Sequence, residues 1–241
     1  MKKLCLICLL TLSYFLLIPF DTTYAKGKQE PVPDTVADSH SKYAAYFQTN
    51  SGRYCTAILI SSTAAITARH CVGKEPAEKV GRIYPGRNGD QRPFGYMNIR
   101  TYIPNSKYDI ALIKGIDRDQ DPFYQTYIKK FSTTVTGYTN EELSRFVGDE
   151  VYSYGYPNRK SVPMRLQYRS DGQIYRHKTS PTPYLFTDMP AGYGGQSGSG
   201  VFKKDSQFIG IIITSKRKNR KPANVLPFTK EIADWINDNA K

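Results

Sequence analysis

Short apolar runs recur along most of the chain and are separated by turn-forming residues. Runs rich in β-branched and aromatic residues cover 54–60, 64–68, 98–103, 110–114, 150–154, 167–174, 185–188, 200–202 and 208–214. Gly, Pro and Asn stand between these runs, and we find no internal repeat or low-complexity tract. Many short strands separated by such turn residues predict an all-β fold of barrels or a sandwich, not a parallel α/β sheet.

One segment near the end has a helical period instead. Ile232, Trp235 and Ile236 fall on one face of a helix over 229–239, and Thr229 can cap its start. We expect this closing helix to pack on a barrel.

The chain begins with the pattern of a secretory signal peptide. Lys2 and Lys3 precede an apolar run over 4–20, and Ala25 offers a small residue for cleavage. A membrane anchor is the alternative, but this run lies at the short limit for spanning a bilayer. We therefore expect export, removal of 1–25 and a mature chain that begins near Lys26.

The segment 26–41 is polar, contains Pro31 and Pro33, and has no apolar period. We interpret it as an extended N-terminal arm or a propeptide remnant.

Cysteine use agrees with export. Cys5 and Cys8 leave with the signal peptide, so Cys55 and Cys71 are the cysteines that remain. An even pair in an exported chain is expected to form a disulfide. Two cysteines and three histidines at these spacings match no metal-ligand pattern, so no metal site is predicted.

The chain is strongly basic, with a net charge of +13 that falls to +12 once Lys2, Lys3 and Asp21 are removed. An exported protein of this charge is expected to associate with anionic cell-wall or surface polymers and to meet acidic proteins. The dense basic run at 216–221 is interpreted as a solvated loop. Because no nucleic-acid-binding motif is present, no specific nucleic-acid partner is expected.

Three separate features carry candidate chemistry, and the first is His70. The predicted strand 64–68 delivers this histidine to a strand end, beside Cys71. An imidazole held there can take a proton from a hydroxyl and return it to a leaving amine. His40 lies in the polar arm and His177 in a predicted loop, so neither has such a setting.

The second feature is Asp109, the one acid that opens the apolar run 110–113. A buried carboxylate needs a partner, and an imidazole N–H is suitable. Such an Asp would hold the base in the right tautomer and stabilise its protonated form.

The third feature is the glycine-rich segment 194–200, Gly-Gly-Gln-Ser-Gly-Ser-Gly. Its glycines let the backbone turn tightly, expose the Ser197 hydroxyl and aim the Gly195 and Ser197 N–H groups at a developing oxyanion. A flexible linker is the alternative, but an apolar strand-like run follows at once. An α/β-hydrolase elbow would require a histidine after the serine, and none follows Ser197.

The order His70, Asp109, Ser197 resembles that of the chymotrypsin-like serine proteases, and most closely their bacterial (staphylococcal-type) glutamyl endopeptidase branch. The resemblance rests on Ala-Arg-His at 68–70, Tyr-Asp-Ile-Ala-Leu-Ile at 108–113, Gly-Tyr-Pro at 155–157 and the segment 194–200. It covers about residues 45–240.

This resemblance implies two six-stranded antiparallel β-barrels with the active site in the cleft between them, followed by the C-terminal helix. The protease domain would span 42–241, with a first barrel over about 42–125 and a second over about 140–226. It further implies a serine endopeptidase that cleaves protein or peptide substrates without a cofactor. With the predicted signal peptide, we expect this enzyme to be secreted, and we expect a monomer. His70, Asp109 and Ser197 would form its catalytic triad, acting through an acyl-enzyme.

The primary pocket departs from the glutamate-specific pattern. Those relatives place a histidine in the strand after the nucleophile and a hydroxyl residue five positions before it, where this chain has Ile212 and Gly192. The acid of trypsin-like pockets is replaced by Ala191. We expect an uncharged pocket, walled by Ala191, Gly192, Tyr193, Ile212, Ile213 and Thr214.

Two other classes of function compete with this interpretation. One is a catalytically silent binding protein or toxin-like adhesin on a protease fold, which the intact candidate triad argues against. The other is a basic nucleic-acid-binding protein, which only the net charge supports. Reaction with a serine-directed fluorophosphonate probe separates the first from an active enzyme.

Overall fold

The computed structural model describes residues 27–158, 165–213 and 222–241. The predicted signal peptide, the basic run at 216–221 and the pocket residue Thr214 lie outside these residues.

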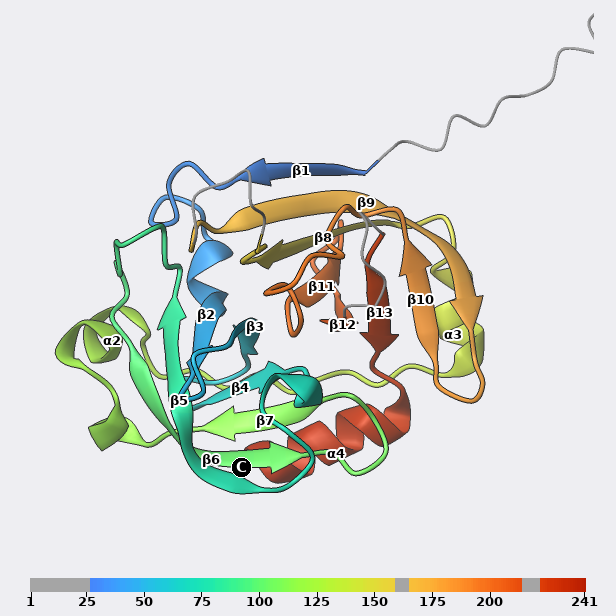
Figure 1. Cartoon of the computed structure of the whole chain (residues 1–241). Helices are drawn as coiled ribbons and strands as arrows, with labels where there is room; N and C mark the ends of the chain where they lie inside the picture. The colour runs from blue at the N-terminus through green and yellow to red at the C-terminus, as the bar shows by residue number, and fades with distance from the viewer. Residues whose placement is uncertain (1–26, 159–164, 214–221) are drawn as a thin grey trace, which may run out of the picture.

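Six antiparallel strands close the first barrel (Figure 1). They follow one another around it in the order β2-β3-β4-β7-β6-β5. The strands are β2 (Ala44–Thr49), β3 (Tyr54–Leu59), β4 (Ala64–Thr67), β5 (Ala77–Pro85), β6 (Met97–Pro104) and β7 (Ala111–Lys114). Buried side chains such as Phe47, Ile66 and Leu112 fill the core to which these strands contribute.

A second set of six strands is ordered β9-β10-β13-β12-β11-β8, and pairing of β8 with β9 closes it as another barrel. The strands are β8 (Glu150–Gly155), β9 (Tyr168–Lys178), β10 (Tyr184–Thr187), β11 (Gly200–Lys203), β12 (Phe208–Ile213) and β13 (Asn224–Pro227). Ile174, Leu185 and Ile209 are among the residues of its separate core. The prediction of two six-stranded antiparallel barrels is confirmed.

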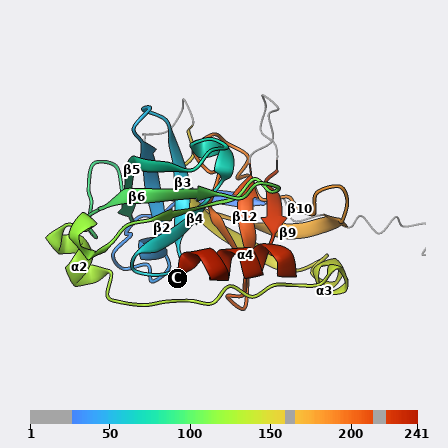
Figure 2. The same cartoon turned by 90° about the horizontal axis from the view of Figure 1, so that it is seen from below.

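The closing helix α4 (Lys230–Ala240) agrees with the prediction. The Thr229 hydroxyl accepts a hydrogen bond from the Ile232 backbone N–H and caps the helix. Ile232 and Ile236 are fully buried in the core of the first barrel, and Figure 2 shows α4 lying along that side of the molecule. None of the helices in the described part of the chain has the length and hydropathy needed to cross a bilayer.

Shorter helices lie in the connections between strands. These are the 3-10 turns η1 (Ser41–Tyr43), η2 (Arg69–Cys71) and η3 (Asp117–Asp119), and the one-to-two-turn helices α2 (Pro122–Tyr127) and α3 (Asn140–Arg145). α2 begins at Asp121, whose side chain accepts from the Tyr124 N–H, and α3 begins with a capping box of Thr139 and Glu142. They are too short to show an apolar period.

Four strands were not anticipated from the apolar pattern: β1 (Lys28–Pro31), β2, β5 and β13. β5 contains charged residues and a register shift between Glu78 and Gly81, which disrupts its alternation. β1 lies in the polar arm and pairs antiparallel with β9, with Gln29 opposite Ser170. Its position depends on backbone pairing with a distant strand, which leaves no apolar signature in the sequence.

A disulfide joins Cys55 on β3 to Cys71 on η2. It ties the turn that carries His70 to the neighbouring strand of the same barrel. Cys55, Cys71 and His70 lie close together, but the disulfide uses both sulfurs and leaves no thiolate there to bind a metal.

We expect the folded, non-reduced mature protein to contain no alkylatable thiol, and reduction to lower the free energy of unfolding by roughly 3 kcal/mol, because a loop of about 16 residues is released. Mass spectrometry after iodoacetamide treatment, together with denaturant titrations with and without reductant, measures both quantities. Two alkylated cysteines in the non-reduced protein would contradict the disulfide.

Candidate active site

His70 occupies the middle of η2, directly after strand β4. The buried Tyr102 hydroxyl is hydrogen-bonded to the carbonyl oxygens of Arg69 (2.8 Å) and Gly73 (2.6 Å), which fixes the ends of this turn. Burial raises the pKa of Tyr102 to about 12, so its hydroxyl keeps its proton and remains a donor. The turn therefore holds the His70 backbone in one place while its ring faces the second barrel.

Asp109 lies just before β7, at the end of a turn that Asn105 organises. The Asn105 side-chain oxygen accepts from the backbone N–H groups of Lys107 (2.9 Å) and Tyr108 (2.8 Å). Asp109 Oδ2 lies 2.7 Å from His70 Nδ1, and its Oδ1 accepts from the His70 backbone N–H at 2.9 Å. One carboxylate thus holds both the ring and the main chain of the histidine.

The charge state of Asp109 suits this contact. Burial alone would raise the pKa of Asp109, but the hydrogen bonds and charge of His70, with Arg69 nearby, lower the pKa below its usual value. The carboxylate is therefore ionised at neutral pH and accepts a hydrogen bond from the Nδ1–H group of His70. This tautomer leaves His70 Nε2 as an acceptor.

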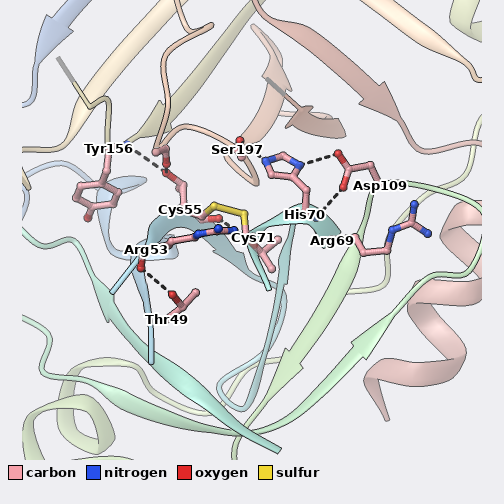
Figure 3. Close-up of a disulfide and its surroundings, with 12 residues drawn as sticks. Thr49, Arg53, Cys55, Arg69, His70, Cys71, Asp109, Tyr156 and Ser197 are labelled. Carbon is pink, nitrogen blue, oxygen red and sulfur yellow. Dashed lines mark hydrogen bonds and ion pairs between the residues drawn. A yellow bond between two sulfur atoms is a disulfide. The ribbon is translucent and has the colours of Figure 1, made fainter. Parts of the chain in front are cut away.

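Ser197 lies on the second barrel, in the turn before β11. Its Oγ is 2.9 Å from His70 Nε2. The Ser197 carbonyl accepts from the Thr56 backbone N–H (2.9 Å), which ties this turn to β3 of the first barrel. Figure 3 shows Ser197, His70 and Asp109 in one line beside the disulfide.

The turn around Ser197 has peptide groups with defined directions. The Gly194 carbonyl accepts from the Asn158 N–H (2.7 Å), and the Gln196 carbonyl accepts from the Ser199 N–H (3.1 Å). Because C=O and N–H point oppositely in a trans peptide, the N–H groups of Gly195 and Ser197 point away from these partners. These two carbonyl contacts therefore leave the Gly195 and Ser197 N–H groups directed to the other side of their peptide planes.

Gly195 has no room for a side chain. Its φ of +85° lies in the left-handed region, and a Cβ there would come 2.3 Å from the Tyr156 carbonyl oxygen and 2.5 Å from the Tyr54 ring. The Thr56 hydroxyl donates to the Gly195 carbonyl at 2.8 Å. Glycine is therefore required at this position for the turn to keep its shape.

The structure brings some of the predicted pocket residues together but not all. Ala191 and Ile212 are fully buried in the apolar cluster of the second barrel. Ile213 packs instead in the cluster of the first barrel, because adjacent residues of a strand point to opposite faces. Gly192 and Tyr193 are partly exposed beside the Ser197 turn.

Three further residues shape this site, and none of them was identified from the sequence patterns. Thr56 supplies the hydroxyl that holds Gly195, and Asn158 holds the Gly194 carbonyl. Gln29 on β1 donates to Ser170 Oγ at 2.8 Å and reaches to 3.5 Å from the Gln196 side-chain oxygen. Of these three residues, only Thr56 could have been identified from the sequence, because it directly follows the disulfide cysteine Cys55.

The comparisons with known proteins agree with this geometry. The model of the trypsin-like peptidase domain family matches residues 55–211. A glutamyl endopeptidase of Bacillus licheniformis is 30% identical over 162 residues, which cover 63% of this chain and 46% of that protein. The chain thus spans less than half the length of this relative.

Two solved structures share the fold. A Glu endopeptidase in complex with MPD is similar with a TM-score of 0.66 and 22% identity, over 88% of this chain and 97% of that one. Protease Anisep from Arthrobacter nicotinovorans has a TM-score of 0.63 and 16% identity, over 88% and 99% of the two chains. With its two barrels, its closing helix and a family match over more than half its length, this chain belongs to the trypsin-like peptidase domain family and has the chymotrypsin-like fold.

Proposed function

We propose that this protein is a serine endopeptidase with Ser197 as nucleophile, His70 as general base and Asp109 as the group that orients the base. The observation that carries this proposal is the continuous hydrogen-bonded line from Asp109 Oδ2 through His70 to Ser197 Oγ, with distances of 2.7 Å and 2.9 Å. Both contacts are within the reach that proton transfer requires.

The reaction follows from this line of contacts. Ser197 Oγ attacks the scissile carbonyl carbon while His70 Nε2 takes the hydroxyl proton, and the N–H groups of Gly195 and Ser197 stabilise the oxyanion. The C–N bond then breaks, and the leaving amine takes the proton from His70. Water, activated by the same imidazole, attacks the ester carbonyl and releases Ser197 with its proton restored. No cofactor takes part in these steps.

We place this activity outside the cell. The predicted signal peptide and the disulfide between Cys55 and Cys71 both suit an exported protein. Its substrates would be proteins or peptides, bound by a monomer, and its basic surface would also favour anionic surface polymers.

Removing the reacting groups tests the assignment. We expect Ser197→Ala and His70→Ala each to abolish peptide cleavage and fluorophosphonate labelling without changing the circular dichroism spectrum. Asp109→Asn should lower turnover on the order of 10⁴-fold, because the wrong imidazole tautomer then faces Ser197. If Ser197→Ala cleaved casein at the wild-type rate, Ser197 would not be the nucleophile.

The backbone of the oxyanion turn can be tested separately. We expect Gly195→Ala to lower turnover by about 100-fold or more, the loss typical of removing one oxyanion donor, because a Cβ there would overlap the Tyr156 carbonyl and the Tyr54 ring. Gly148→Ala is the matched control, since Gly148 also has a positive φ but a Cβ there meets nothing within 4 Å. Equal turnover of the two variants would contradict the proposed oxyanion hole.

The primary pocket is expected to select an uncharged, apolar residue before the cut. Ala191 and Ile212 offer neither a cation for Glu nor an acid for Lys or Arg, and an unpaired charge in such a slot is strongly unfavourable. A peptide library profiled at low and high ionic strength measures this preference. Strong selection for Glu at that position at both salt levels would overturn the pocket assignment.

A further inference from the structure

Arginine and tyrosine side chains gather beside the oxyanion turn, next to Gly195. We call this group the Arg–Tyr cluster; it consists of Tyr46, Tyr54, Tyr84, Arg87, Arg92 and Arg165. It begins at the turn itself, since the Tyr54 ring fills the space next to Gly195. Tyr46 then stacks on Tyr54 with ring centroids 4.9 Å apart.

The guanidinium groups follow directly behind the rings. Arg87 lies 4.9 Å from the Tyr46 ring centre and 5.0 Å from that of Tyr84, and Arg92 lies 4.9 Å from the Tyr84 ring centre. Burial raises the pKa of Tyr46, while the charges of Arg87 and Arg165 oppose that rise, so both arginines lie close to this ring.

Positive charge in the cluster is only partly balanced. Arg87 is 2% exposed, and both burial and the charges of Arg165 and Arg92 lower its pKa. Among the described residues, the carboxylate that pairs with Arg87 (3.7 Å) and Arg165 (3.0 Å) is Asp90, whose side chain is 94% exposed. The buried Arg87 and the more exposed Arg165 therefore share one carboxylate, that of Asp90, which is itself surrounded by solvent.

The accessible donors of the cluster are guanidinium groups. The Tyr54 hydroxyl has no hydrogen-bond partner among the described residues, but it is enclosed and does not reach solvent. Arg92 is exposed and Arg165 is partly exposed, so their N–H groups are the ones that a ligand can contact. A carboxylate is the acceptor with which such groups form strong, charge-assisted hydrogen bonds.

The direction of the substrate chain places the cluster. In the proposed reaction His70 gives its proton to the leaving amine, so the chain after the cut leaves on the side of His70 and the disulfide, where Tyr54 directly precedes Cys55. An extended peptide advances about 3.3 Å per residue. The second or third residue after the cut therefore comes level with Tyr46 and the guanidinium groups.

We propose that the Arg–Tyr cluster binds an acidic side chain of the substrate, two or three residues after the scissile bond. Arg165 and Arg92 contact the carboxylate, and Arg87 supplies charge from beneath. This inference rests on the proposed proteolytic function. It gives the enzyme an apolar requirement before the cut and an acidic preference after it.

Amidated, internally quenched peptides that differ only by Asp or Asn at one of the four positions after the cut test the proposal. We expect kcat/KM to favour Asp by about tenfold at the second or third position and nowhere else, the ratio that one charge-assisted hydrogen bond provides. The amidated ends exclude binding of a terminal carboxylate. Equal rates for every Asp and Asn pair would overturn the subsite.

Variants assign the preference to the arginines. Arg165→Gln and Arg92→Gln should each lower the Asp-to-Asn ratio several-fold, and the double variant should bring it close to one. Arg176→Gln is the matched control, because Arg176 is exposed beside Phe186 on the second barrel and changes the net charge equally. Asp90→Asn should raise the ratio, since it removes the competing carboxylate. An unchanged ratio in the double variant would exclude the cluster.

Binding to Ser197→Ala separates this inference from the proposed function. Fluorescence anisotropy with the same Asp and Asn peptides needs no turnover, and we expect tighter binding of the Asp peptide that is lost with Arg165→Gln and Arg92→Gln together. Equal binding of both peptides overturns the acidic subsite, even if the wild-type protein cleaves both. Preferential binding without cleavage by the wild-type protein would support the anion site and overturn the endopeptidase assignment.

Discussion

The hydrogen bond between Ser197 and His70 joins residues from the two barrels, so the site depends on how the barrels are held against each other. Thr56 is central to that attachment. Its backbone N–H donates to the Ser197 carbonyl, and its hydroxyl donates to the Gly195 carbonyl and accepts from the Tyr156 N–H. Its own carbonyl accepts from the Thr67 hydroxyl on β4. One buried residue thereby links two strands of the first barrel to the nucleophile turn of the second.

Close packing at this junction explains the glycines of the nucleophile turn. A Cβ at Gly198 would come 2.2 Å from the Thr56 carbonyl oxygen, and one at Gly195 would meet the Tyr156 carbonyl. The turn can approach the first barrel only because both side chains are absent. This approach brings Ser197 Oγ within reach of His70, so sterics as well as hydrogen bonding set the geometry of the candidate triad.

Charge is distributed unevenly around the site. The walls expected to hold the residue before the cut are apolar, whereas the side past Gly195 carries several guanidinium groups and one exposed carboxylate. Selectivity would then arise from desolvation in the pocket and from charge pairing along the leaving chain. Because charge pairing at a partly exposed site is screened by salt and desolvation is not, the two contributions are physically separable.

Local sequence determined a large part of this protein. Alternating and apolar runs between turn residues indicated most strands of both barrels, and the helical period after Thr229 indicated α4. His70, Asp109 and Ser197 could be chosen because each stands at the edge of an apolar run with the neighbours its chemistry needs. Tertiary structure decided what depends on distant contacts: the pairing of β1 with β9, the roles of Thr56 and Asn158, and the separation of Ile213 from Ile212. Tertiary structure also decided the cluster of Tyr46, Arg87 and Arg165. These residues are far apart in the chain and meet only after both barrels have closed.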